Sequence, residues 1–152
     1  MKNDIDSNFS LCSKTCKKIT KKYGAHNSAL DYPEAERVVA LVWTVAGIVE
    51  NGGFRYLFGS VLPGDGNYAI TINAFKQIGC LNVAETIDKA VHIFPNGEPH
   101  IDDHDRVTWF EQQPEQTRNQ LDTAFWNELD NITLSLARYI REHDEFRGTK
   151  NP

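Results

Sequence analysis

The segment VVALVWTVAGIVENGGFRYLF, residues 38–58, decides the fold of this 152-residue chain. Its first part, residues 38–49, is a dense apolar run that Thr44 interrupts. A membrane span needs about 20 such residues, so this run is too short to cross a bilayer. Wound into a helix, its apolar side chains cover nearly the whole circumference, which is typical of a helix buried at the centre of a domain. We therefore predict a central helix that begins after Pro33 and ends near Glu50.

The sequence Asn51-Gly52-Gly53 predicts the end of this helix, because these residues tolerate the left-handed backbone that a helix C-cap requires. The aromatic residues that follow predict a short helical turn from Phe54 to Ser60. A glycine pair could instead cradle a phosphate, but such loops usually precede a helix, so that the helix N-terminus faces the anion. Since this pair follows a helix, we interpret Asn51, Gly52, Gly53 and Phe54 as a structural corner.

The N-terminal segment predicts an amphipathic helix. Apolar side chains recur every three or four positions and form one stripe, made of Ile5, Phe9, Cys12, Cys16, Ile19 and Tyr23. Aspartates at the start of this segment and lysines at its end suit the helix dipole. The chain has three cysteines, too few for a zinc site at the usual paired spacing. Because Cys12 and Cys16 lie on the stripe, we interpret them as core residues.

The rest of the chain predicts further helices. Apolar periodicity indicates helices over residues 70–78 and 83–94, and a long last helix that starts near Pro114-Glu115 and runs to about 146. Residues 95–117 predict a long, polar, mostly irregular connection with a turn at 107–110. Loops of this length are uncommon in compact domains and are often functional or mobile.

These elements predict an all-α fold, a single compact bundle of about five to six helices around a buried central helix. A length of 152 residues suits one domain, 1–152. We divide it into the N-terminal amphipathic helix (1–24), a helical core (34–146) and a polar tail (147–152).

Charge is unevenly distributed along the chain. The net charge is −5, but residues 1–22 hold six lysines and two aspartates, so they carry +4 and the remainder carries −9. Much of the negative charge lies at Glu98, Asp102, Asp103, Asp105, Glu111 and Glu115. Such a surface repels DNA phosphates and attracts a basic protein surface, although a loop that is merely solvated has the same composition.

The segment His100-Ile101-Asp102-Asp103-His104-Asp105 is the strongest candidate for a metal site, because imidazole and carboxylate are common ligands. Its spacing matches neither HExxH nor an EF-hand loop. The chain also has no GxSxG, P-loop or dinucleotide-binding motif. We therefore predict no metal, no cofactor, no catalytic residue and no enzymatic activity.

Several stretches resemble a bacterial family of uncharacterised helical domains related to a DNA-mimic protein. The residues that carry the resemblance are the helix and NGGF corner at 43–58, followed by 74–80, 90–94 and 136–143, so that it covers about 34–146. The resemblance implies an all-helical fold. One member of that family is an acidic, helical dimer that occupies the DNA-binding face of a transcription factor, which implies a role as a protein-binding decoy. This chain departs from the family in its modest net charge and its basic N-terminal segment.

The main functional hypothesis is a non-enzymatic protein-interaction domain whose acidic region, 98–115, meets a basic partner such as a DNA-binding protein. Two alternatives remain open: an immunity or regulatory partner of a toxin, and a metal-dependent enzyme centred on residues 100–105. We expect no direct binding of nucleic acid or membrane, and a homodimer is one assembly that the resemblance suggests. The N-terminus is charged and lacks an apolar signal core, so we expect a cytoplasmic protein.

Overall fold

The computed structural model describes residues 2–24, 28–62 and 64–147, and within them every regular element is a helix. The all-α prediction is therefore confirmed, with seven α-helices in place of five to six. They are α1 (Lys2–Tyr23), α2 (Glu34–Gly59), α3 (Ala69–Gln77), α4 (Leu81–Val91), α5 (Asp103–Glu111), α6 (Glu115–Trp126) and α7 (Leu129–Glu142), with short 3-10 turns at Ala29–Asp31, Pro95–Gly97 and Asp144–Phe146. Of the predicted tail, all but Arg147 lies outside the described residues.

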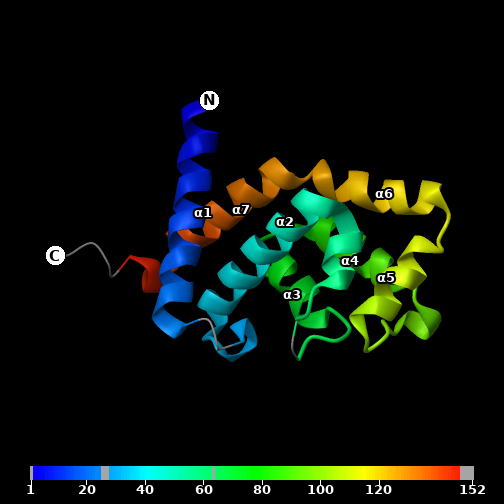
Figure 1. Ribbon diagram of the computed structural model, residues 1–152. Coiled ribbons are helices and arrows are strands. Elements are labelled where there is room, and N and C mark those ends of the chain that lie inside the picture. The colour runs from blue at the N-terminus through cyan, green and yellow to red at the C-terminus, as the bar shows by residue number, and fades with distance from the viewer. Residues whose placement is uncertain (1, 25–27, 63, 148–152) are drawn as a thin grey trace.

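Helix α2 is the centre of the bundle, as its sequence predicts. It packs against α1, α3, α5, α6 and α7 (Figure 1). Val39, Val42, Val45 and Val49 are completely buried. Because each of these side chains leaves water on folding, this helix contributes a large share of the hydrophobic free energy.

The NGG corner interrupts α2 where the sequence places a helix end. Gly52 (φ −154°, ψ 17°) and Gly53 (φ 68°, ψ −164°) leave the helical region, and the chain then resumes helical geometry up to Gly59. Phe54 follows directly and is fully buried, with its ring 5.9 Å from that of Phe58 and 5.9 Å from that of Phe125. The corner therefore redirects the chain so that an aromatic cluster forms in the core.

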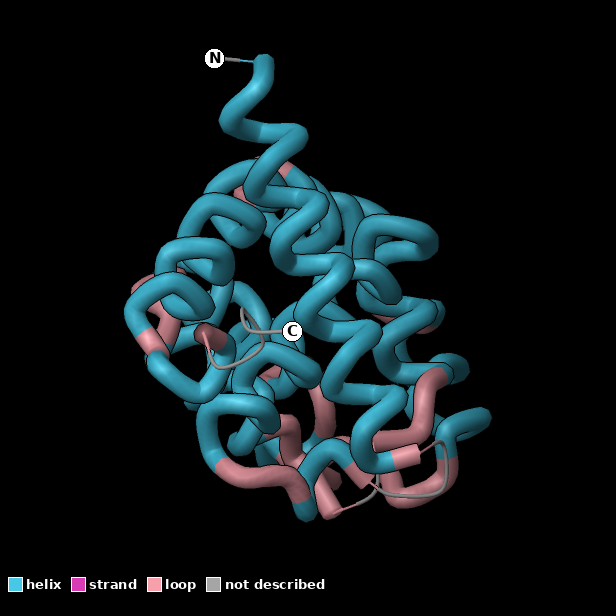
Figure 2. The backbone as a smooth tube through the Cα atoms, turned by 90° about the vertical axis from the view of Figure 1, so that its left-hand side faces the viewer, coloured by secondary structure: helices cyan, strands magenta, loops and turns pink. Residues whose placement is uncertain are grey.

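Helix α1 packs on α7 and α2 only along part of its length. Cys12 and Ile19 are buried, but Ile5 and Phe9 are 52% and 54% exposed. Figures 1 and 2 show the reason, since the N-terminal turns of α1 project beyond the body of the bundle. The first two members of the predicted stripe therefore lie largely outside the core.

The connection at 95–117 is more ordered than its sequence suggests. Helix α5 occupies Asp103–Glu111, where we expected an irregular segment with one turn. The helix was missed because it is short and its buried side consists only of Arg106 and Phe110, so it lacks a run of apolar positions.

The predicted last helix is two helices, α6 and α7, which the turn at Asn127 and Glu128 separates. Here the Glu128 amide donates to the carbonyl of Phe125 over 2.9 Å, a tighter turn than an α-helix makes. The break lets α6 pack on α2 and α4 while α7 packs on α1 and α2. One straight helix would point one of the two apolar faces away from the core.

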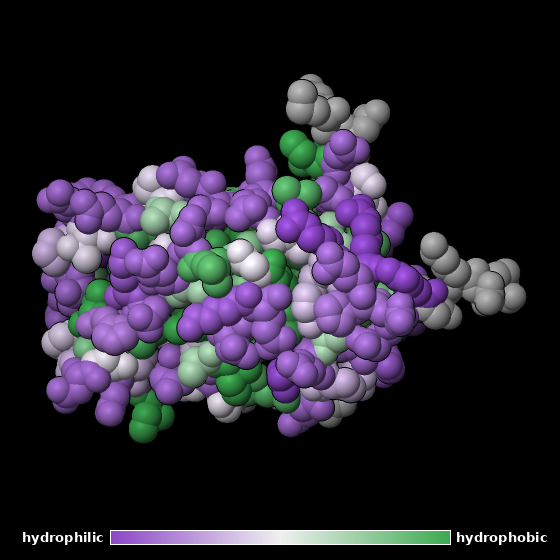
Figure 3. Space-filling view, turned by 180° about the vertical axis from the view of Figure 1, so that it is seen from behind, coloured by the Kyte–Doolittle hydropathy of each residue, from purple (hydrophilic) through white to green (hydrophobic). Residues whose placement is uncertain are grey.

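The face seen in Figure 3 is largely hydrophilic, with smaller hydrophobic patches. No helix in the described part of the chain is both long enough and apolar enough to cross a membrane.

Candidate functional site

Arg106 organises the region where the acidic residues gather. It lies on α5, only 8% of its surface is exposed, and its guanidinium donates four hydrogen bonds to backbone carbonyls. The acceptors are Phe58 (2.7 Å), Ser60 (3.1 Å), His100 (3.0 Å) and Ile101 (2.9 Å). These bonds join the end of α2 to the segment before α5, and thereby hold that segment in one conformation.

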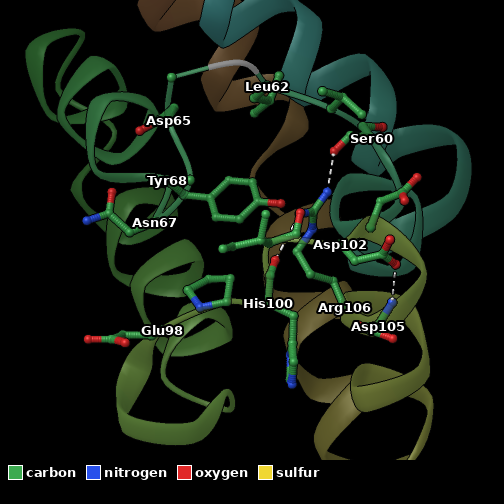
Figure 4. Close-up of a pocket in the computed structure, with 16 residues that line it drawn as sticks. Ser60, Leu62, Asp65, Asn67, Tyr68, Glu98, His100, Asp102, Asp105 and Arg106 are labelled. Atoms are coloured by element: carbon green, nitrogen blue, oxygen red, sulfur yellow. Dashed lines mark hydrogen bonds between the residues drawn. The ribbon is translucent and has the colours of Figure 1, made fainter.

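A hollow of about 810 Å³ is lined by residues 60–62 and 64–68 on one side and by residues 98–103, 105 and 106 on the other. Figure 4 shows Tyr68 on one side and Asp102 and Asp105 on the other, with the Arg106 side chain between them. The hollow is open to solvent, so a side chain from another protein could enter it.

The wall formed by residues 65–71 is held by a buried carboxylate. Asp65 is 2% exposed and caps the start of α3 by accepting from the amides of Ile70 (2.8 Å) and Thr71 (2.9 Å) and from Thr71 Oγ1 (2.7 Å). Tyr68 lies inside this turn in the left-handed conformation (φ 61°), and Figure 4 shows its hydroxyl directed into the hollow. Burial raises the pKa of Tyr68 to about 12, so its hydroxyl stays neutral and able both to donate and to accept.

Four of the six predicted acidic residues line this hollow, and we call them the acidic corner: Glu98, Asp102, Asp103 and Asp105. All four are exposed. Asp102 is the N-cap of α5 and accepts from the Asp105 amide over 3.1 Å, and Asp103 and Asp105 lie in the first turn. Carboxylates are stable in this place because the helix dipole is positive there. Within the described part of the chain, none of the four forms an ion pair.

The other two predicted acidic residues lie apart from the acidic corner. Glu111 ends α5, about 12 Å along the helix axis from Asp103, and Glu115 begins α6. Glu111 is also neutralised, because its Oε1 is 2.6 Å from Nε of Arg55. The hydrogen bond and charge of Glu111 raise the pKa of Arg55 above its usual value. Only four of the six residues therefore gather in one place.

The histidines of the 100–105 segment do not join its aspartates in a ligand set. The His100 ring packs against Phe94 and Trp109, with centroids 5.7 and 5.6 Å away, and His104 is exposed on α5. Within residues 2–24, 28–62 and 64–147, no three His, Cys, Asp or Glu side chains are grouped so that they could hold a metal ion. The geometry that the metal alternative requires is therefore not assembled in this part of the chain.

The NGGF corner lies near Asp122 of α6. The Phe54 amide donates to Oδ1 of Asp122 over 2.8 Å, so this carboxylate caps the helical turn that follows the glycines. A Cβ on Gly53 would lie 2.7 Å from the Asp122 carboxylate, and one on Gly52 would lie 2.1 Å from the ring of Tyr56. The corner is thus filled by the protein itself, which fits a structural interpretation.

Sequence reasoning missed the residues that hold the site together. Asp65 carried a signal, because an aspartate ahead of an apolar helical segment is a common N-cap residue. Arg106 stood out only as the single cation among the acidic residues. The partners of Arg106 lie up to 48 positions away in the sequence, and Phe54 and Asp122 are 68 positions apart. No local sequence pattern reports pairs that are so far apart.

Comparison with known proteins gives one match. A family model described as DMP19-like protein matches residues 30–143, which include α2 to α7 and leave α1 outside. No curated protein and no solved structure matches the chain significantly.

Proposed function

We propose that this chain, which belongs to the DMP19-like (DNA mimic protein 19) family, is a non-enzymatic protein-interaction domain that acts as a DNA-mimic-like decoy. Its partner is a DNA-binding protein whose basic face normally contacts phosphates. The contact surface is the acidic corner, and Glu111, which Arg55 neutralises, and Glu115 lie outside it.

The observation that carries the proposal is a set of exposed carboxylates that are not neutralised and that lie on a backbone segment held by the hydrogen bonds of Arg106. The guanidinium of Arg106 donates its hydrogen bonds to backbone carbonyls. Within the described residues it forms no ion pair with Asp102, Asp103 or Asp105. A basic partner can therefore pair with these carboxylates without first breaking internal salt bridges. Because Arg106 already holds the backbone before α5, less backbone ordering has to accompany binding.

The test is affinity capture from the native cell at low salt, using the full chain as bait. The variant D102N/D103N/D105N removes three charges from the acidic corner, and asparagine at position 102 still caps α5. The matched control D130N/E142Q/E145Q removes three exposed charges from α7 and the turn after it. We expect the wild type and the control variant to capture a DNA-binding protein, and the D102N/D103N/D105N variant not to capture it. Duplex DNA should displace this protein from the wild type.

Each other outcome has a definite meaning. A partner that duplex DNA does not displace would contradict DNA mimicry while leaving a protein-interaction role in place. A toxin captured through the same carboxylates would favour the immunity alternative. Equal capture by the corner variant and the wild type would show that the acidic corner is not the binding surface.

A further inference from the structure

Tyr68 is a buried polar side chain without a hydrogen-bond partner. It is 3% exposed, and its hydroxyl makes no hydrogen bond within the described residues. Figure 4 shows this hydroxyl directed into the hollow from one side. The hydroxyl lines a hollow that is open to solvent, so a ligand that enters the hollow can donate a hydrogen bond to it.

The charge around the hollow determines which ligand suits it. Besides the four carboxylates of the acidic corner, the lining contains the buried Asp65 and one cation, Arg106. Asp65 already accepts three hydrogen bonds and Arg106 already donates four, so neither is free for a strong new contact. The formal charge of the lining is therefore negative, which disfavours an anion and favours a cation.

Apolar side chains flank the same hollow. Ile101 is 101% exposed and Val61 is 69% exposed, and both line it. Exposed aliphatic groups beside carboxylates match the structure of a long basic side chain, which has an apolar stem and a charged end.

We propose that the hollow is the receptor for a single lysine or arginine side chain of the partner, whose cation pairs with Asp102 and Asp105 and donates a hydrogen bond to the Tyr68 hydroxyl. The stem of this side chain packs against Ile101 and Val61. The inference rests on the proposed function and deepens it, because it assigns one central contact to a surface that otherwise acts only through charge. Central, desolvated contacts of this kind dominate many interfaces.

The test uses the protein alone, as a nuclear magnetic resonance titration of the 15N-labelled full chain at low salt. The probes are N-acetyl-L-arginine amide and N-acetyl-L-lysine amide, with the uncharged N-acetyl-L-citrulline amide as the control. We expect saturable shifts of the backbone amides of Tyr68, Ile101 and Arg106 with at least one cationic probe and none with citrulline. The Tyr68→Phe variant should bind this probe about fivefold more weakly, because it lacks one hydrogen bond.

Two controls separate binding from folding. Tyr68→Phe removes a hydroxyl that has no partner among the described residues, so its midpoint of urea unfolding should equal that of the wild type. D102N/D105N should abolish saturation, whereas D130N/E142Q/E145Q should leave it unchanged. The proposal would be overturned by shifts that do not saturate or by the same shifts with the citrulline control. It would also be overturned if Tyr68→Phe bound the cationic probe as tightly as the wild type does.

The titration and the capture experiment can fail separately. If capture succeeds and the titration fails, the acidic corner binds its partner without a side chain in the hollow. If the titration succeeds and capture fails, the receptor exists but the decoy function is wrong.

Discussion

Gly53 is the residue at which α2 stops being one helix. Its φ of 68° and ψ of −164° lie in a region that is essentially restricted to glycine. The Asp122 carboxylate also lies where a Cβ would be, 2.7 Å away. Two independent constraints, one on the backbone and one on space, therefore require glycine here.

Gly53→Ala should lower the free energy of unfolding by about 3 kcal/mol, because the variant is strained in its backbone and displaces the cap of Phe54. The measurement is urea unfolding followed by circular dichroism. Gly47→Ala is the matched control, since it lies in α2 with nothing within 4 Å of an added Cβ. This control should be neutral or stabilising by up to about 1 kcal/mol.

Arg106→Lys should lower the free energy of unfolding by about 3 kcal/mol, although it keeps the charge. Lysine cannot reproduce the planar fork that reaches four carbonyls, and buried acceptors left without a donor are costly. Denaturant unfolding measures this effect. Arg138→Lys, at an exposed position of α7, should change stability by less than about 0.5 kcal/mol, and an equal effect of the two would contradict the role given to Arg106.

Asp122 links stability to pH. Burial raises the pKa of this carboxyl in the folded protein, partly offset by the hydrogen bond from Phe54 and by Arg118. The folded protein then binds the proton more tightly than the unfolded chain does, so this group favours folding at pH values below its unfolded pKa. The contribution is lost as the pH rises through the folded pKa.

The stability of the wild type relative to Asp122→Asn should therefore be higher at pH 4 than at pH 7. Asparagine keeps a side-chain oxygen that can accept the hydrogen bond of the Phe54 amide, and its side chain does not titrate. The difference should stay below about 1 kcal/mol, because Asp122 is only partly buried. Paired unfolding curves at the two pH values measure it, and a difference of the opposite sign would contradict the raised pKa.

At the scale of the element, α1 combines two kinds of surface on one stripe. Its first turns project from the bundle, while its centre packs on α7 and α2. The hydrogen bond from Arg141 Nη2 to Asn8 Oδ1, 2.8 Å long, lies near the point where the two kinds meet. A regular apolar period therefore does not by itself tell how much of a helix is covered.

The stripe should show this division in its energetics. Ile19→Ala should lower the free energy of unfolding by about 2–4 kcal/mol, because Ile19 is 3% exposed and its loss leaves a cavity. Ile5→Ala should cost less than about 0.5 kcal/mol, because Ile5 is 52% exposed. Thermal or urea unfolding of the two variants gives the comparison, and similar values would mean that α1 packs along its whole length.

At the scale of the whole molecule, opposite charges are separated. The lysines of α1 lie at one end of the bundle, and the acidic corner before and within α5 lies at the other (Figure 1). The modest net charge of −5 is the sum of +4 for residues 1–22 and −9 for the rest of the chain, so it does not reveal this local distribution. An interaction surface depends on local charge, so the total is a poor guide to what the acidic end attracts.

The salt dependence of partner binding should follow the acidic corner and not the net charge. D102N/D103N/D105N and D130N/E142Q/E145Q change the total equally, but only the first should make log Kd depend less steeply on log salt concentration. Isothermal titration calorimetry with the captured partner, at several salt concentrations, measures both slopes. Equal slopes for the two variants would mean that the molecule acts through its overall charge.

The sequence by itself determined the helical class, the central α2 and the break at Gly52 and Gly53. Each of these depends on interactions between residues a few positions apart, which apolar periodicity and glycine content report directly. The acidic character of residues 98–105 was visible for the same reason.

Only the tertiary structure decided how these pieces form a site. The guanidinium of Arg106 reaches carbonyls up to 48 residues away, Asp122 caps Phe54 across 68, and Trp126 donates to the Val49 carbonyl across 77. The division of the C-terminal segment into α6 and α7, and the meeting of Tyr68 with the acidic corner, also depend on which surfaces pack together. Packing between distant segments selects these arrangements, so they exist only in the folded chain.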